Sequence, residues 1–145
     1  MILIKYLFLI IFPIVAGMIM SGGVGQFIDP PSVFIVIVPT VGTLLVAYKG
    51  SFISSVTSIW QYTGNEKLST AIAFWKTVRT CAVGYGCLGF FIGLVSMLSS
   101  LDDMELLGPR MAIALLAVAH GIVARYLVAE PIIALLENKK RQSRI

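Results

Sequence analysis

Long apolar stretches separated by short polar segments dominate the sequence. A helix needs roughly 20 apolar residues to cross the hydrocarbon core of a bilayer, and four stretches reach or approach that length. The pattern therefore predicts an all-α integral membrane protein, with residues 1–145 forming a single membrane domain of four transmembrane helices. In chain order the predicted segments are a first span at 2–20, a second span at 32–48, a polar middle segment at 49–76, a third span at 78–98, an outer loop at 99–107, a fourth span at 108–131 and a basic tail at 132–145.

The first apolar stretch has a second interpretation. Lys5 followed by an apolar run also has the form of a secretory signal peptide. No soluble domain follows it for export, so we expect a retained helix. After it, the glycines and prolines of 21–31 cannot continue a helix, and Pro30 and Pro31 are placed to begin the second span.

The middle segment has an ordinary soluble composition. Phe52, Val56 and Ile59 recur at helical spacing before Gly64 and Asn65, which signal a turn. The segment is expected to form two short amphipathic helices or extensions of the flanking spans. The piece after the turn, 66–76, is expected to run into the third span.

The distribution of basic residues predicts the orientation of the chain. The segments 21–31 and 99–107 contain no Lys or Arg, and cytoplasmic loops are the ones enriched in these residues. Both loops are therefore expected to face outward, with both termini and the middle segment in the cytoplasm. Arg110 is the one basic residue against this pattern, and the acidic loop beside it is a candidate to neutralise its charge.

Composition and charge agree with a membrane location. Hydrophobic residues make up 58% of the chain and charged residues 12%, outside the range of soluble domains. The net charge of +4 does not indicate nucleic-acid binding, because a basic cluster after a membrane span is more simply a topology anchor or a contact with anionic lipid. The four basic residues at the C-terminal end are Lys139, Lys140, Arg141 and Arg144.

The sequence contains no motif of an enzyme or a metal site. It has no HExxH, CxxC, GxSxG or Walker pattern, and Cys81 and Cys87 lie on different faces of one predicted helix. We therefore expect no enzymatic activity, no catalytic residue, no metal and no cofactor.

Small residues distinguish the third and fourth spans. In lipid, such residues allow two helix backbones to approach closely, so they indicate either ordinary helix packing or a surface for a helix of another chain. Spacing alone favours ordinary packing. The small residues are Gly84, Gly86, Gly89 and Gly93 on the third span and Ala114, Ala117, Gly121 and Ala124 on the fourth.

The order of motifs in this half of the chain resembles the third and fourth helices of the MotA/TolQ/ExbB proton-channel family. Upstream, the loop and second span are similar to those of the flagellar stator A-subunits, the MotA/PomA branch. The residues that carry the resemblance are AVGYGCLGFFIGLV at 82–95, Met97, Leu98, Leu101–Asp103, Leu107–Pro109, MAIALL at 111–116, Gly121 and Pro131, and then GGVGQFID at 22–29 with Ser32, Ile35, Val36 and Gly42.

The resemblance implies a subunit of an ion-driven motor in the bacterial inner membrane. Family members form a homopentamer around a dimer of single-span MotB-, ExbD- or TolR-like partners, whose aspartate binds the ion. Independently, the third and fourth spans hold no carboxylate at mid-membrane, so a proton carrier would come from another chain. The resemblance also implies a helix hinge at Pro131 and a set of residues facing the pore or the partner: Gly86, Gly89, Phe90, Gly93, Ala114, Ala117, Gly121 and Ala124.

Several positions depart from the family pattern. Val83 replaces a proline, Phe90 replaces a threonine, and Ala117 and Val118 replace paired threonines. Sodium needs oxygen ligands, so the loss of these hydroxyls favours protons. A proton would pass through the partner's carboxylate and waters; alternatively Phe90 closes the path and leaves a scaffold that conducts nothing.

The middle segment departs further from the stator subunits. Those proteins use a large cytoplasmic domain to push on the flagellar rotor, and here about 28 residues stand in its place. We expect a short form that does not drive a flagellum through the usual charged surface.

Three ionisable residues lie in the middle and the inner part of the fourth span. His120 is either a proton relay or a neutral histidine hydrogen-bonded to an adjacent helix. Arg125 and Glu130 are five positions apart, on different faces of an α-helix, so they are not expected to pair with each other. They are expected to set topology by pairing across a subunit boundary or by reaching the headgroups.

Overall fold

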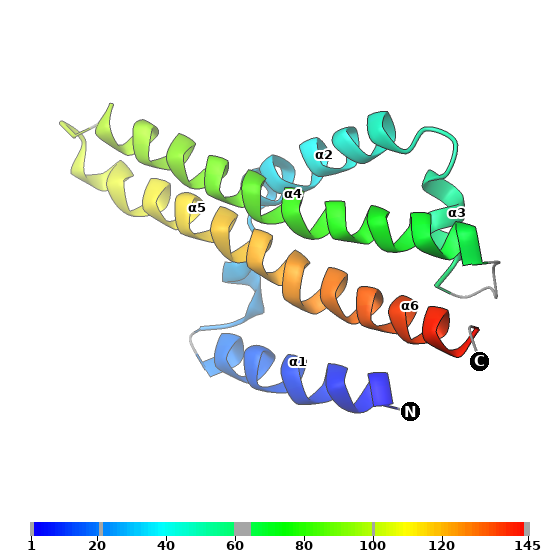
Figure 1. The fold of residues 1–145 in the computed structure, drawn as a ribbon. Coiled ribbons are helices and arrows are strands. Elements are labelled where there is room, and N and C mark those ends of the chain that lie inside the picture. Colours follow the sequence, from blue (N-terminus) through cyan, green and yellow to red (C-terminus); the bar gives the residue numbers. More distant parts are fainter. Residues whose placement is uncertain (1, 21, 60–64, 100, 144–145) are drawn as a thin grey trace.

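The computed structural model describes residues 2–20, 22–59, 65–99 and 101–143, and the described residues form helices with short connections and no strand (Figure 1). The prediction of an all-α chain is confirmed. The elements are α1 (Ile2–Met20), the 3-10 helix η1 (Val24–Phe27), α2 (Pro30–Ala47), α3 (Phe52–Thr57), α4 (Asn65–Leu98), α5 (Met104–Val123), the π-helix η2 (Ala124–Ala129) and α6 (Glu130–Gln142).

The turn between α1 and α2 follows from its residues. Gly22 and Gly23 have φ values of 120° and 112°, a conformation that glycine adopts without steric cost. The Asp29 side chain accepts a hydrogen bond from the Ser32 backbone N–H at 3.0 Å and caps the start of α2. Pro30 and Pro31 occupy the first turn, where a backbone N–H has no partner within the helix.

Two long helical rods form the centre of the structure (Figure 1). The helix α4 runs antiparallel to the continuous rod formed by α5, η2 and α6, and the two are in contact along their length. The helix α2 packs against both α4 and α5, whereas α1 contacts η1 and η2. The second half of the chain is thus a helix pair with the first half packed on its sides.

Three helical stretches are long and apolar enough to cross a membrane, Pro30–Ala47, Glu66–Leu98 and Met104–Gln142. Within α1, the described stretch Ile11–Met20 is apolar but shorter than a crossing requires. The crossing predicted for 2–20 therefore stays a prediction. The 33 residues of Glu66–Leu98 correspond to about 50 Å of helix, against a hydrocarbon core of about 30 Å. One end of α4 therefore extends beyond the hydrocarbon.

The helices extend further than the hydropathy pattern indicates. In the middle segment, α3 is a separate short helix and α4 begins at Asn65, before the predicted third span, while Gly64 lies outside the described residues. The last rod begins at Met104, where Asp103 accepts a hydrogen bond from the Glu105 N–H at 3.2 Å, and it continues to Gln142. Its charged end stays helical because Glu, Lys, Arg and Gln are good helix formers.

A buried core lies at the end of the rods where α2 ends and α6 ends. Phe74 is at its centre, with ring centroids 5.3 Å from Tyr48, 5.4 Å from Phe52 and 5.6 Å from Trp75, all in edge-to-face geometry. Leu136 of α6 is fully buried in the same core. This packing fixes α3 and the first turns of α4 against α6.

Candidate functional site

Glycines and alanines form the contact between α4 and α5. A Cβ atom added to Gly89 would lie 2.7 Å from the Ala117 Cβ, and one added to Gly121 would lie 2.6 Å from the Ala82 carbonyl oxygen. A Cβ on Gly93 would overlap the Ala114 side chain. These separations are shorter than carbon and oxygen atoms tolerate without a bond, so the helices approach this closely only because glycine occupies these positions.

Six of the eight residues expected to face the pore or the partner take part in this contact within the single chain, and their role toward a pore or a partner stays a prediction. Ala114 and Ala117 are 1% and 0% exposed, and the glycines at 86, 89, 93 and 121 are also buried in the single chain. Side chains enclosed in this way serve the packing of α4 on α5. Small residues mark a close helix contact without indicating whether the neighbouring helix belongs to the same chain. Phe90 and Ala124 are partly exposed, and their predicted role also stays a prediction.

The positions that depart from the family pattern bring no hydroxyl group to the α4–α5 contact. Ala117 packs on Gly89, and Phe90 lies next to Phe91 with ring centroids 5.9 Å apart. Val83 and Val118 are half-buried. Oxygen atoms of α4 instead face α2 in two hydrogen bonds that sequence reasoning missed. Thr43 Oγ1 lies 2.7 Å from Tyr85 Oη, and Tyr48 Oη lies 2.9 Å from Thr77 Oγ1.

A cluster of three charges joins α4 to the last rod. Glu130 Oε1 accepts a hydrogen bond from Arg79 Nη1 at 3.2 Å and lies 3.9 Å from Arg125 Nε, too far for a second hydrogen bond. The three side chains are 30–35% exposed. One carboxylate therefore compensates two guanidinium groups and links the start of α6 to α4.

The expectation that Arg125 and Glu130 do not pair is wrong. It assumed 3.6 residues per turn, but the residues between them form the π-helix η2, in which the Glu130 N–H donates to the Arg125 carbonyl five positions earlier. The wider turn brings the side chains onto one face. Pro131 follows directly and lacks an N–H, so the local widening also relieves the clash that a proline ring makes within an α-helix. The hinge role of Pro131 stays a prediction.

His120 makes a hydrogen bond to the loop before α2. Its Nε2 lies 3.0 Å from the Phe27 carbonyl oxygen, which only accepts, so Nε2 carries the proton. Nδ1 is buried and has no hydrogen-bond partner among the described residues. The ring lines an apolar cavity of about 520 Å³ between α1, η1 and α5. This contact is the one expected of a structural histidine; the relay role stays a prediction.

A pair of variants separates these roles of His120. His120→Phe removes the donor to the Phe27 carbonyl and is expected to cost about 1 kcal/mol of folding free energy while leaving ion flux unchanged. His120→Gln keeps a donor without a titratable ring and is expected to retain both stability and flux. The measurements are detergent unfolding and proton flux in vesicles. Loss of flux in a stable His120→Gln protein would contradict the structural role.

At the end of the helix pair where α4 ends and α5 begins, Arg110 connects α5 to α4. Its Nη1 donates to the Ser96 carbonyl oxygen at 2.6 Å, in the last turn of α4. Carbonyls at a helix C-terminus lack partners within the helix and attract cations. Among the described residues, no three His, Cys, Asp or Glu side chains gather in a way that would hold a metal ion.

The fold and this site define a class: a helical, multi-pass membrane protein built on a glycine-packed helix pair that has no carboxylate of its own at mid-membrane. Residues 50–144 match the MotA/TolQ/ExbB proton channel family, and the chain belongs to that family. The predicted family and its stator A-subunit branch are confirmed.

Similar curated proteins include motility and chemotaxis proteins. The chain is 36% identical over 76 residues to Motility protein A of Aquifex aeolicus, covering 52% of this chain and 30% of that protein. It is 32% identical over 78 residues to Chemotaxis protein PomA of Vibrio alginolyticus, covering 54% and 31%, respectively. Uncharacterized protein YtxD of Bacillus subtilis is 47% identical over 58 residues, 40% of this chain and 21% of that protein. The matches span less than a third of each relative.

Proposed function

We propose that the chain is a proton-conducting subunit of an ion-driven motor in the bacterial inner membrane. It forms a homopentamer around a dimer of single-span MotB-, ExbD- or TolR-like partners, with four crossings and both termini in the cytoplasm. The observation that carries the proposal is the α4–α5 pair, which lies in the family-matching region and contains no Asp or Glu between residues 80 and 101 or between 106 and 129. An ion carrier in this membrane region would therefore come from the partner, as an aspartate.

The exposed apolar residues of α4 support contacts with other chains. Because most of the small residues are already enclosed between α4 and α5, bulky side chains make up much of the α4 surface left for neighbours. Phe91, Ile92 and Val95 are 58–66% exposed in the single chain. In a bilayer such a face contacts lipid or another helix, and here it would contact adjacent subunits of the pentamer and the partner helices.

Protons fit this site better than sodium. Sodium is held by oxygen ligands, and the side chains at positions 83, 90, 117 and 118 offer none. The hydroxyl groups of Thr43 and Tyr85 are hydrogen-bonded to each other between α2 and α4, away from the α4–α5 contact. A proton needs only the partner's carboxylate and ordered water.

The work done by this motor is expected to differ from turning a flagellar rotor. Between α2 and α4 the chain has the short helix α3, which packs on α4, in place of a large rotor-contacting domain. In a strain that lacks its flagellar stator A-subunit, expression of this chain with its partner is expected to leave cells non-swimming in soft agar. Restored swimming would overturn this part of the proposal.

A scaffold without conduction is the second candidate. Phe90 stands where the family has a threonine, and its partly exposed ring is large enough to close a narrow path. Such a protein would keep the assembly and lose the flux. Ion flux through an intact complex separates the two candidates.

The assembly is tested by purification with a partner. A single-span protein with an aspartate early in its apolar helix, encoded beside this chain, is the partner to co-express. Native mass spectrometry of the purified complex is expected to give a pentamer of this chain with a partner dimer. A stable complex of another stoichiometry, or no association, would contradict the proposed assembly.

A further inference from the structure

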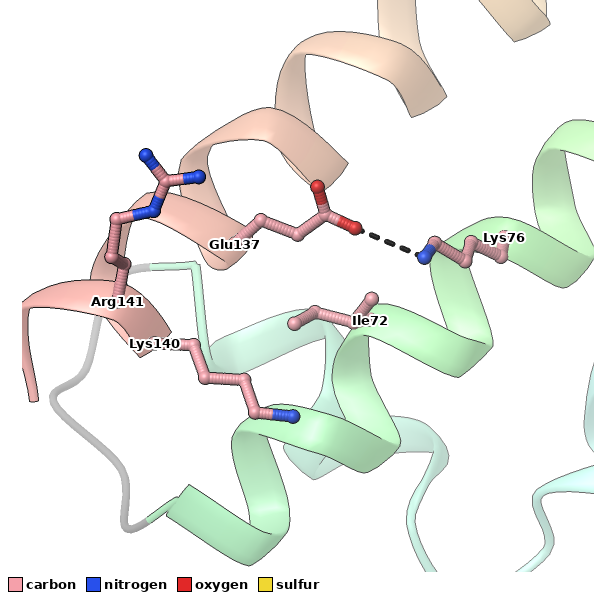
Figure 2. Close-up of a pocket in the computed structure, with 5 residues that line it drawn as sticks. All are labelled: Ile72, Lys76, Glu137, Lys140 and Arg141. Atoms are coloured by element: carbon pink, nitrogen blue, oxygen red, sulfur yellow. Dashed lines mark ion pairs between the residues drawn. The ribbon is translucent and has the colours of Figure 1, made fainter. Parts of the chain in front are cut away.

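A polar pocket lies between α4 and α6, at the end of the rods that carries the basic C-terminal residues. It has a volume of about 330 Å³ and is lined by Ile72 and Lys76 of α4 and by Glu137, Lys140 and Arg141 of α6. Figure 2 shows Ile72 between the two helices, with the Lys76–Glu137 pair on one side of it, the Lys140 ammonium group on the other, and Arg141 directed away from it along the outer side of α6. Ile72 is 8% exposed, so the pocket combines a buried apolar residue with a charged rim.

The rim has an excess of positive charge. Lys76 Nζ lies 3.0 Å from Glu137 Oε1, which compensates that lysine. Lys140 Nζ donates to Ser69 Oγ at 2.7 Å, which holds the ammonium group toward α4 and leaves two of its three N–H donors for other acceptors. Among the described residues, neither Lys140 nor Arg141 forms an ion pair with a carboxylate. Lys140 and Arg141 are therefore the uncompensated cations among the residues that line the pocket.

Other basic side chains near the pocket are engaged elsewhere. Lys139 Nζ donates to the Ile59 carbonyl oxygen at 2.7 Å, and Arg79 is paired with Glu130. The uncompensated positive charge among the lining residues therefore belongs to Lys140 and Arg141.

The pocket lies beside the expected membrane surface. Lys76 is two residues before the apolar stretch that begins at Val78, and Ile72 is one turn further from it, about 6 Å along the helix. The headgroup region of a bilayer extends several ångströms beyond the hydrocarbon on each side, and lysine and arginine side chains reach along a helix toward it. In the proposed orientation this is the cytoplasmic face, where anionic lipids attract basic residues.

From this juxtaposition we infer that the α4–α6 pocket binds the headgroup of an anionic phospholipid. Lys140 contacts the phosphate oxygens, Arg141 adds positive potential from the outer side of α6, and Ile72 contacts the glycerol and the upper part of an acyl chain. An amphipathic pocket at the membrane surface suits a ligand with a phosphate and an attached apolar part better than it suits a free anion. The inference concerns lipid binding and does not depend on whether the complex conducts ions.

The test measures lipid binding by the purified full-length chain in detergent. Dioleoylphosphatidylglycerol and dioleoylphosphatidylcholine are titrated separately, and bound lipid is counted by native mass spectrometry. The anionic lipid is expected to bind more tightly, and Lys140→Ala/Arg141→Ala to reduce that preference about 25-fold, from about fivefold for each basic residue. Glu137→Gln is expected to raise the preference for the anionic lipid about fivefold, because the substitution frees Lys76 to contact the lipid.

A matched control removes two charges outside the pocket. Lys49→Ala/Lys67→Ala changes the net charge by the same amount at exposed positions and is expected to leave the lipid preference unchanged. Equal binding of both lipids, an equal loss in the control, or no gain in Glu137→Gln would overturn the inference. Inorganic phosphate is added as a competitor; displacement of the lipid at equal concentration would identify a site for soluble anions and would also overturn it.

Discussion

Gly121→Ala is expected to destabilise the folded chain by about 1–3 kcal/mol, although alanine is the better helix former. The added methyl group would lie 2.6 Å from the Ala82 carbonyl oxygen and 3.3 Å from the Gly86 Cα. Both are backbone atoms, so a change of rotamer cannot relieve the clash, and α4 and α5 must separate. Separation loses the dispersion contacts that hold two helices together in lipid, where burial of apolar surface gives no driving force. Unfolding in a titration of denaturing detergent measures the effect.

Gly84→Ala is the matched control for this variant. It adds the same methyl group to the same helix pair, at a position where the new atom meets nothing within 4 Å. Helix propensity then acts alone, and we expect no loss of stability and a gain of up to about 1 kcal/mol. Equal stability of Gly121→Ala and Gly84→Ala would show that the close contact between α4 and α5 does not contribute as described.

Glu130→Gln is expected to cost about 1–3 kcal/mol of folding free energy. The change removes the charge that compensates Arg79 and Arg125, whose side chains are about two-thirds buried. Two guanidinium groups of like charge would then face each other between α4 and η2. In the double variant Arg79→Gln/Glu130→Gln one of these charges is also gone, so we expect it to recover part of the loss, a coupling that a double-mutant cycle measures.

Glu137→Gln provides the comparison for the charge cluster. The ion pair of Glu137 with Lys76 is about half exposed on both sides, and exposed pairs contribute about 0–1 kcal/mol. Glu137→Gln should therefore lower the folding free energy clearly less than Glu130→Gln does. If both variants lost the same stability, the linking role assigned to Glu130 would be contradicted.

Three of the spans and the start of α2 were predictable because they depend on local chemistry. Apolar runs of sufficient length indicated the three described helices that are long and apolar enough to cross a membrane. Pro30 and Pro31 indicated the start of α2, and the structure places them in its first turn. These features require no knowledge of which helices are neighbours.

The charge cluster was not predictable by the same reasoning. The prediction for Arg125 and Glu130 used the angular spacing of an α-helix, and a single π-helical turn changes which residues share a face. Pro131, next to this turn, was the available signal, because a proline inside a continuous helix requires some local departure from α geometry. The partner Arg79 comes from another helix, 51 residues away in the chain, which spacing along one helix cannot indicate.

The small residues show a further limit of sequence patterns. Glycine and alanine at spacings of three and four correctly indicated a close helix contact, but the pattern is the same for a neighbour in the same chain and for a partner chain. Only the fold places Gly89 against Ala117 and Gly93 against Ala114. The contacts with other chains proposed here accordingly rest on the exposed bulky residues of α4.

Proton flux through the assembled complex tests the central claim most directly. Vesicles containing this chain and its partner are given a membrane potential, and the entry of protons is followed with a pH-sensitive dye. The account predicts a flux that is independent of sodium and is abolished when the partner's aspartate is changed to asparagine. Absence of flux from an intact complex would contradict conduction and favour the scaffold.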